Sequence, residues 1–242
     1  MYPELFSIGN ITIYTYGVFV ALGFFVGMQY TIKYSNNIIK KQKLYDFLFY
    51  VILFGIIGAR FFYILLNLPY YLSNPLEILQ VWKGGLVYYG GFIAVLIFSF
   101  LYCRRKKINI VKLMDLFAPA LALGHAFGRI GCFFSGCCYG KNSDCFFAVA
   151  NRHPTQLYEA FGNLIIFFIL HNLYKRSHQN GHVFVLYMLM YSVLRFSVEF
   201  FRGDDRGDFL FGLSPAQNIS IVIFIVAIII LLSIKNGAKN EK

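Results

Sequence analysis

Seven long runs of apolar residues dominate this chain and constrain its fold more than any other feature of the sequence. Each run is about 20 residues long, the length that a helix needs to cross the hydrocarbon core of a bilayer. None shows the two-residue alternation of a barrel strand, so helices are the structures that would satisfy their backbone in lipid. The predicted membrane helices cover residues 13–32, 46–66, 86–103, 113–130, 156–174, 182–201 and 216–234. We therefore expect an all-α polytopic membrane protein with seven transmembrane helices.

The composition excludes the soluble alternatives. Hydrophobic residues make up 58% of the 242 residues and charged residues only 14%, whereas soluble domains are about half apolar and a quarter charged. Disorder is excluded as well, because 28 Phe and 18 Tyr supply too much aromatic surface. Residues 1–12 lack the basic segment of a signal peptide, so the first apolar run is expected to remain as a membrane helix. No linker or internal repeat divides the sequence, and we expect one integral membrane domain over residues 1–242.

The distribution of basic residues predicts the orientation of the helices. Fourteen of the 22 Lys and Arg residues fall in the connections 33–45, 104–112 and 175–181 and in the C-terminal tail, against five in the connections on the opposite side. Cytoplasmic connections carry the excess of basic residues in membrane proteins. The N-terminus is therefore expected outside and the C-terminus in the cytoplasm. The net charge of +11 follows from this topology and indicates no nucleic-acid partner.

Five ionisable residues fall within or at the ends of the predicted membrane helices, where charge is costly and usually marks function. They are Arg60, Arg129, Glu159, Arg195 and Glu199. Arg195 and Glu199 are four residues apart on one helix, so they share a face and can form an ion pair. Such a pair can be purely structural, but three arginines against two glutamates leave one positive charge without a partner. This excess predicts an anionic ligand, and a guanidinium suits phosphate because it donates two hydrogen bonds at once.

Glycine density is the second signal in the sequence. Two glycine pairs flank two tyrosines in the stretch 84–91, and five more glycines lie between residues 124 and 140. Glycine can serve tight helix packing, which is our interpretation for Gly23 and Gly27 on the first helix. Around the tyrosines and Arg129, we interpret the density as more than packing, because glycine also permits unusual backbone and the close approach of a bulky ligand.

Four of the five cysteines lie at or within one outside connection: Cys132, Cys137, Cys138 and Cys145. Their spacing matches no standard zinc pattern, so a metal site is the least favoured of three interpretations. A disulfide, for example between Cys138 and Cys145, is favoured over a metal if the compartment is oxidising. Packing of small side chains is favoured over both. We assign no metal, and we predict no catalytic cysteine because no histidine stands at a triad-like spacing.

Taken together, these residues resemble the bacterial prolipoprotein diacylglyceryl transferases, and the likeness spans nearly the whole chain. Seven motifs stand in the family's order, each weak alone and highly specific in combination. In chain order they are Tyr16-Gly17, Gly58-Ala59-Arg60 with Tyr63, Trp82-Lys83-Gly84-Gly85 through Gly90-Gly91, Gly128-Arg129-Ile130-Gly131 through Gly140, His153-Pro154-Thr155-Gln156-Leu157-Tyr158-Glu159, Arg195 through Glu199-Phe200-Phe201-Arg202, and Gln217. The resemblance implies a multi-pass protein of the bacterial cytoplasmic (inner) membrane.

The resemblance also implies the reaction and its partners. A diacylglyceryl group moves from phosphatidylglycerol to the lipobox cysteine of a prolipoprotein, a thioether forms, glycerol-1-phosphate leaves, and no cofactor is required. Arg129 and Arg195 are expected to bind the phosphate, with Glu199 orienting Arg195. Further contacts to phosphatidylglycerol are expected from Tyr16, Gly140 and Arg202. Structural roles are expected for Arg60 and Glu159.

Two positions depart from the family pattern. Tyr89 stands where many members carry the histidine that is the usual candidate base, and Cys132 stands where the signature has asparagine. Because a phenol ionises only near pH 10, we expect Tyr89 to bind the head group within the catalytic set rather than to remove the thiol proton. The departures leave open a paralogous lipid transferase with a different acceptor. A small-molecule transporter is less favoured, because the sequence shows no inverted repeat.

Overall fold

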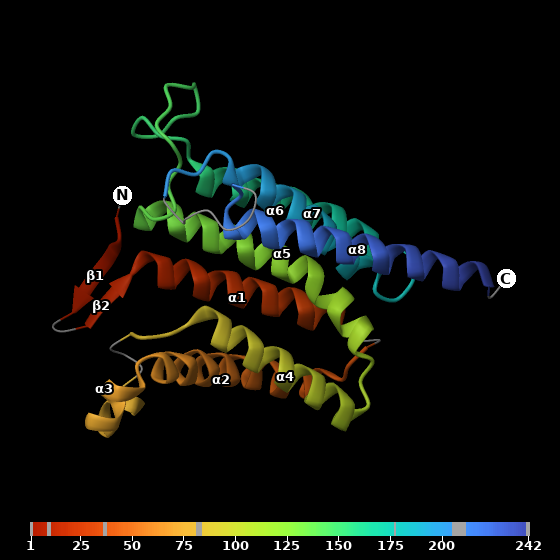
Figure 1. Ribbon diagram of the computed structural model, residues 1–242. Helices are drawn as coiled ribbons and strands as arrows, with labels where there is room; N and C mark the ends of the chain where they lie inside the picture. Colours follow the sequence, from red (N-terminus) through yellow and green to blue (C-terminus); the bar gives the residue numbers. More distant parts are fainter. Residues whose placement is uncertain are drawn as a thin grey trace. The chain divides into compact units, whose positions relative to one another are not determined.

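The computed structural model describes residues 2–8, 11–35, 38–80, 84–176, 178–204 and 212–240. These residues form eight α-helices, a short 3-10 helix and a two-stranded hairpin (Figure 1). Six of the described helices are long and apolar enough to cross a membrane, which confirms a helical, multi-pass protein. The helix α4 (Tyr88–Lys106) is not among them, because it opens on two tyrosines and two glycines and ends on three basic residues. The count of seven spans therefore stays a prediction.

Each of the seven apolar runs nevertheless forms one helix, and the observed ends lie within six residues of the predicted ones. Besides α4, these helices are α1 (Thr15–Tyr34), α2 (Lys41–Leu66), α5 (Ile110–Ser135), α6 (Thr155–Lys175), α7 (His182–Glu199) and α8 (Pro215–Asn240). Several run into polar flanking sequence, which hydropathy alone excludes from a membrane helix. Trp82 and Lys83 of the third motif, and the basic residues Arg206 and Lys242 of the topology count, lie outside the described residues.

By their internal contacts the helices form two compact units, one of them Tyr34–Leu113 and the other Met1–Lys33 with Met114–Lys242. The Tyr34–Leu113 unit contains α2, α3 (Leu68–Ser73), the 3-10 helix η1 (Pro75–Leu79) and α4. Here α2 and α4 pack closely: a Cβ added to Gly90 would lie 2.6 Å from the carbonyl oxygen of Gly58, and one on Gly91 would lie 2.7 Å from that of Gly55. Helix packing explains this glycine pair, so the interpretation that the glycine density exceeds what packing needs was wrong for these two residues.

The other unit begins with a hairpin that hydropathy did not predict. Strands β1 (Glu4–Ile8) and β2 (Ile11–Tyr14) pair antiparallel, with Phe6 opposite Ile13. The expected first helix started at residue 13, but β2 occupies residues 11–14 and α1 begins at Thr15. The amide of Thr15 donates to the carbonyl of Pro3 at 3.0 Å, so the hairpin leads directly into the helix.

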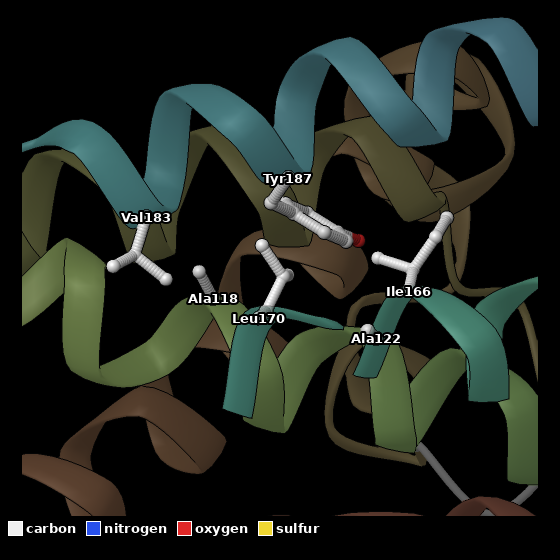
Figure 2. Close-up of a cluster of buried hydrophobic side chains, with 6 residues drawn as sticks. All are labelled: Ala118, Ala122, Ile166, Leu170, Val183 and Tyr187. Carbon is white, nitrogen blue, oxygen red and sulfur yellow. The ribbon is translucent and has the colours of Figure 1, made fainter. Parts of the chain in front are cut away.

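The core of this unit lies where α5, α6 and α7 meet. Small alanines on α5 allow branched side chains of α6 and α7 to approach, and Tyr187 closes the cluster (Figure 2). Its six buried members are Ala118, Ala122, Ile166, Leu170, Val183 and Tyr187. Close packing of this kind makes each side chain's position sensitive to its neighbours. The cluster thereby fixes the helices that carry the charged residues described below.

Two further contacts hold α5 in place within the unit. A Cβ on Gly23 of α1 would lie 2.8 Å from Phe127 Cβ and 3.1 Å from the carbonyl oxygen of Gly124, which confirms the packing role expected for Gly23. Asp115 accepts hydrogen bonds from the amides of Gly181 (2.6 Å) and Phe184 (2.8 Å) at the start of α7. A carboxylate at a helix N-terminus satisfies otherwise unpaired N–H groups, here from a different helix.

Candidate active site

Glu159 on α6 lies at the centre of the charged residues. The residue is 1% exposed, and its carboxylate contacts arginines from two other helices. Oε1 lies 3.0 Å from Arg129 Nε on α5, and Oε2 lies 3.7 Å from Arg195 Nη1 on α7. Tyr191 donates a hydrogen bond to Oε1 at 3.3 Å. Sequence reasoning gave Glu159 a structural role and did not single out Tyr191, although Tyr191 lies one helical turn before Arg195 on the same face.

Arg195 and Glu199 form the ion pair that their spacing predicts. Nη2 of Arg195 lies 2.7 Å from Oε2 of Glu199, and both residues are 8% exposed. Ser214, just before α8, donates to Oε1 of the same glutamate at 2.9 Å. Arg195 on α7 and Ser214 before α8 thus both hold the Glu199 carboxylate. This fixes which nitrogen of Arg195 faces Glu199.

Arg202 continues the row of charges beyond the end of α7. It donates two parallel hydrogen bonds of 2.8 Å to Asp204 and lies 3.8 Å from Glu199. Its backbone forms an isolated bridge with Gly140, where an added Cβ would stand 2.8 Å from the carbonyl oxygen of Phe201. Gly140 is therefore required because the two backbones approach too closely for a side chain. The amide of Lys141 completes the contact by donating to the Phe201 carbonyl at 2.8 Å.

These residues form what we call the arginine–glutamate cluster. Its members are Arg129, Arg195 and Arg202 with Glu159, Glu199 and Asp204. The charges balance, so the count of one arginine in excess was wrong: it included Arg60, which belongs to the other unit, and omitted Arg202 and Asp204. One donor and one acceptor nevertheless remain, because Arg195 Nη1 and Glu199 Oε2 are buried and have no hydrogen-bond partner among the described residues. A buried N–H of a guanidinium without an acceptor is costly, and an anionic oxygen would satisfy it.

Tyr16, at the start of α1, lies beside the cluster. Its side chain is 47% exposed and within electrostatic reach of Arg129 and Cys132. A Cβ on Gly131 would lie 3.4 Å from the Tyr16 ring and 2.9 Å from Phe19 Cβ, so this glycine allows α1 and α5 to approach. The structure thus brings together Tyr16, Arg129, Gly140, Arg195, Glu199 and Arg202 in one unit.

The cysteines are arranged differently from the sequence expectation. All five are free, so the suggested Cys138–Cys145 disulfide is absent. Cys138 instead lies with Cys132 and Cys137, the three sulfur atoms within 4.8 Å of one another. Cys145 Sγ lies 3.7 Å from Nδ1 of His153, a thiol–imidazole contact that sequence spacing did not predict.

Arg202 and Cys138 perturb each other's titration outside the membrane helices. Burial alone would lower the pKa of Arg202, but its hydrogen bonds to Asp204 and Cys138 raise that pKa above its ordinary value. Hydrogen bonds from Cys132 and Arg202 lower the pKa of Cys138 below the usual thiol range, although burial opposes them. Arg202 is therefore always charged, and its positive charge favours the ionised form of the neighbouring thiol.

Arg60 has a different environment, in the Tyr34–Leu113 unit. Its guanidinium donates to the carbonyl oxygens of Glu77 (2.6 Å), Ile78 (3.1 Å) and Gly84 (2.8 Å), and a further bond reaches Gly85. Both glycines have left-handed backbones, with φ of 86° and 72°, which turns their carbonyls toward the arginine. This matches the structural role expected for Arg60 and the unusual backbone expected of this glycine pair.

Tyr89 lies in the same unit as Arg60, in the first turn of α4. It is 62% exposed, and its ring meets that of Tyr88 edge-to-face with centroids 5.7 Å apart. Tyr89 belongs to the Tyr34–Leu113 unit, and the arginine–glutamate cluster belongs to the other unit. Its role in binding a head group stays a prediction.

Comparison of the sequence with known proteins identifies relatives of this chain. A family model described as prolipoprotein diacylglyceryl transferase matches residues 3–233. The chain is 36% identical over 244 residues to the phosphatidylglycerol–prolipoprotein diacylglyceryl transferase of Clostridium tetani, covering 95% of this chain and 96% of the relative. Proteins of the same name from Finegoldia magna and Rickettsia bellii are each 35% identical, covering 95% of this chain and 94% of the relative. The matched range includes every residue of the arginine–glutamate cluster.

Proposed function

The chain belongs to the prolipoprotein diacylglyceryl transferase family, and from this premise we propose how the arginine–glutamate cluster serves the reaction. The protein is a membrane transferase that moves the diacylglyceryl group of phosphatidylglycerol to a prolipoprotein. The acceptor is the thiol of the lipobox cysteine. Its sulfur attacks the glyceryl carbon, a carbon–sulfur bond forms, and the bond between that carbon and the phosphate oxygen breaks. Glycerol-1-phosphate leaves with the bonding electrons, and a base takes the thiol proton.

The chemistry defines what the protein must supply. As the carbon–oxygen bond breaks, the phosphodiester becomes a monoester and gains negative charge. Donors that already point at this charge lower the barrier, because they need no reorganisation during the reaction. Guanidinium groups suit the task, since each presents a planar fork to two phosphate oxygens. We assign the phosphate to Arg129 and Arg195.

One observation carries this assignment: Arg195 Nη1 is buried without a hydrogen-bond partner among the described residues, 3.7 Å from Glu159. Glu199 holds Nη2 of the same guanidinium, so the unused nitrogen has a fixed direction. Arg129 keeps 23% of its side chain exposed and can contact a second oxygen. A phosphate oxygen would supply an acceptor for Arg195 Nη1 without separating Arg195 from Glu199.

The remaining site residues have supporting roles in the proposal. Tyr16 is half exposed beside Arg129 and offers a hydroxyl to the lipid head group. Gly140 keeps Arg202 at its place by close backbone contact, and Arg202 adds positive potential. Tyr89 binds the head group as a neutral donor and does not act as the base.

We propose that the protein spans the bacterial cytoplasmic (inner) membrane seven times as a single domain, with the N-terminus outside. The apolar helices and the basic residues at one end of α4 support this topology. Reporter fusions in the connection 136–154 and after residue 236 test it. The first should be active only outside and the second only in the cytoplasm, and the reverse result would overturn the orientation.

The transferase is tested with purified protein, phosphatidylglycerol vesicles and a peptide that carries one lipobox cysteine. Mass spectrometry should detect the diacylglyceryl thioether on the peptide and an equal amount of glycerol-1-phosphate. A peptide with serine at the cysteine position is the matched control and should stay unmodified. Movement of substrate across the vesicle without a thioether would favour a transporter and contradict the proposal.

A further inference from the structure

Three cysteines converge beside the arginine–glutamate cluster, and the proposed lipid transfer uses none of them. The sulfur atoms of Cys132, Cys137 and Cys138 all lie within 4.8 Å of one another, and the three thiols are free. A tetrahedral zinc ion with sulfur ligands at about 2.3 Å separates those ligands by about 3.8 Å. The three sulfurs therefore need to contract by about 1 Å or less to share one ion, a change that side-chain rotation can supply.

The backbone between the cysteines is held in the conformation that brings them together. Cys132 lies in the last turn of α5, and the amide of Cys137 donates to the carbonyl of Cys132 at 3.2 Å, which turns the chain back toward the end of the helix. Cys138 has a φ of 60°, a left-handed conformation that is uncommon for a residue with a side chain. The buried side chains of Thr155 and Gln156 fix the turn by donating to the carbonyls of Cys138 (2.9 Å) and Cys137 (2.7 Å).

We propose that Cys132, Cys137 and Cys138 form a binding site for a thiophilic metal ion of the zinc or copper(I) class. Thiolate ligands select such ions over magnesium, calcium or manganese. Cys137 is exposed, so an ion can enter from the surface of the loop. Three protein ligands leave the fourth position of a tetrahedral ion for a ligand from solution.

The positive charges of neighbouring arginines favour a metal ion bound by the three thiolates. Three thiolates around a divalent ion carry a single net negative charge, which needs cations close by. Arg202 and Arg129 are both within electrostatic reach of Cys138, and Arg129 is also within reach of Cys132. Two guanidiniums of the arginine–glutamate cluster are thus close enough to offset this charge. Sequence spacing did not favour this site, because the reversal after α5 decides which sulfurs meet.

The fourth cysteine of the same region serves as the control. Cys145 lies against His153, with 3.7 Å between sulfur and Nδ1, and is not part of the sulfur trio. It is exposed like Cys137. Cys145→Ser and Cys137→Ser therefore remove one accessible thiol each, and only the second removes a proposed ligand.

The test is a titration of reduced, metal-free protein in detergent with Co²⁺ under anaerobic conditions. We expect one equivalent to bind with the near-ultraviolet absorption of cobalt–thiolate charge transfer. Zn²⁺ or Cu⁺ should then displace the cobalt, and the stronger competitor identifies the preferred ion. Because the readout is metal binding, it does not depend on lipid transfer and separates this proposal from the proposed function.

Variants decide whether the three cysteines are the ligands. Cys137→Ser should weaken Co²⁺ binding by more than the roughly 10–100-fold that loss of an outer-shell partner costs, and Cys145→Ser should leave the absorption unchanged. Cys137 is exposed, so its replacement tests the site even if Cys132→Ser, at a buried position, fails to fold. The absence of charge-transfer absorption in the wild type, or equal losses in the Cys137 and Cys145 variants, would overturn the proposal.

Discussion

Arg60 and Arg195 are both buried arginines on predicted membrane helices, yet their partners differ completely. Arg60 is 6% exposed and Arg195 is 8% exposed. All three nitrogens of Arg60 donate to backbone carbonyls, two of them in η1 and two at Gly84 and Gly85. Arg195 faces the carboxylates of Glu159 and Glu199 and keeps one buried nitrogen without a hydrogen-bond partner in the described part of the chain.

The difference separates a structural arginine from one suited to bind an anion. A guanidinium whose three nitrogens all donate to backbone carbonyls fixes that backbone and has little left to offer a ligand. A guanidinium oriented by carboxylates, with one nitrogen unused, gains a hydrogen bond when an anionic oxygen arrives. The hydrogen-bond donors that lack a partner are therefore the best criterion for separating a structural arginine from an anion-binding arginine at membrane depth.

The largest effect on stability is expected at Glu159, which joins the two arginines of the cluster. Glu159→Ala leaves buried guanidinium groups without their shared carboxylate, and breaking a buried pair in this way costs about 3–5 kcal/mol. Chemical unfolding in detergent micelles measures the loss. Glu4→Ala, at an exposed position, is the matched control and should change little. Equal stability of the Glu159 variant and the wild type would show that the cluster is not what holds α5, α6 and α7 together.

Arg60→Lys tests whether Arg60, unlike Arg195, has a purely structural role. An ammonium cannot reach all four carbonyl oxygens, and each buried acceptor left unpaired costs about 1–3 kcal/mol. The variant should unfold at lower temperature, while thioether formation per folded molecule stays within about tenfold of wild type. Thermal unfolding and the lipobox-peptide assay on the same sample separate the two quantities. A variant with unchanged stability and lost turnover would place Arg60 in the catalytic chemistry instead.

A smaller effect is expected at Tyr89. If its hydroxyl only donates to the lipid phosphate, Tyr89→Phe loses one hydrogen bond to a charged group, about 1.5–3 kcal/mol. Turnover should fall without vanishing, and the acidic limb of the pH–rate profile should not move. Tyr88→Phe, on the neighbouring ring, is the control, and Tyr89→His should be tolerated. A folded, lipid-bound Tyr89→Phe that is inactive or loses a limb of the profile would identify Tyr89 as the base.

Hydropathy and helical spacing predict the features that are local in sequence. The seven helices follow from runs of apolar residues, and the Arg195–Glu199 pair follows from a spacing of four on one helix. The contacts of Glu159 with Arg129 and Arg195 join three helices, and no pattern within one segment encodes them. The cysteine trio likewise depends on a chain reversal, and the hairpin before α1 depends on pairing between two short strands.

The central claim is that Arg195 holds the phosphate of phosphatidylglycerol through its fork of donors. The direct measurement is the rate of thioether formation at saturating phosphatidylglycerol for wild type, Arg195→Lys and Arg195→Ala, each checked for folding. We expect both variants to lose about 2.7–4 kcal/mol of transition-state stabilisation, roughly a hundred- to a thousandfold in rate, with lysine nearly as poor as alanine because an ammonium lacks the fork. Full turnover by well-folded Arg195→Ala would contradict the claim.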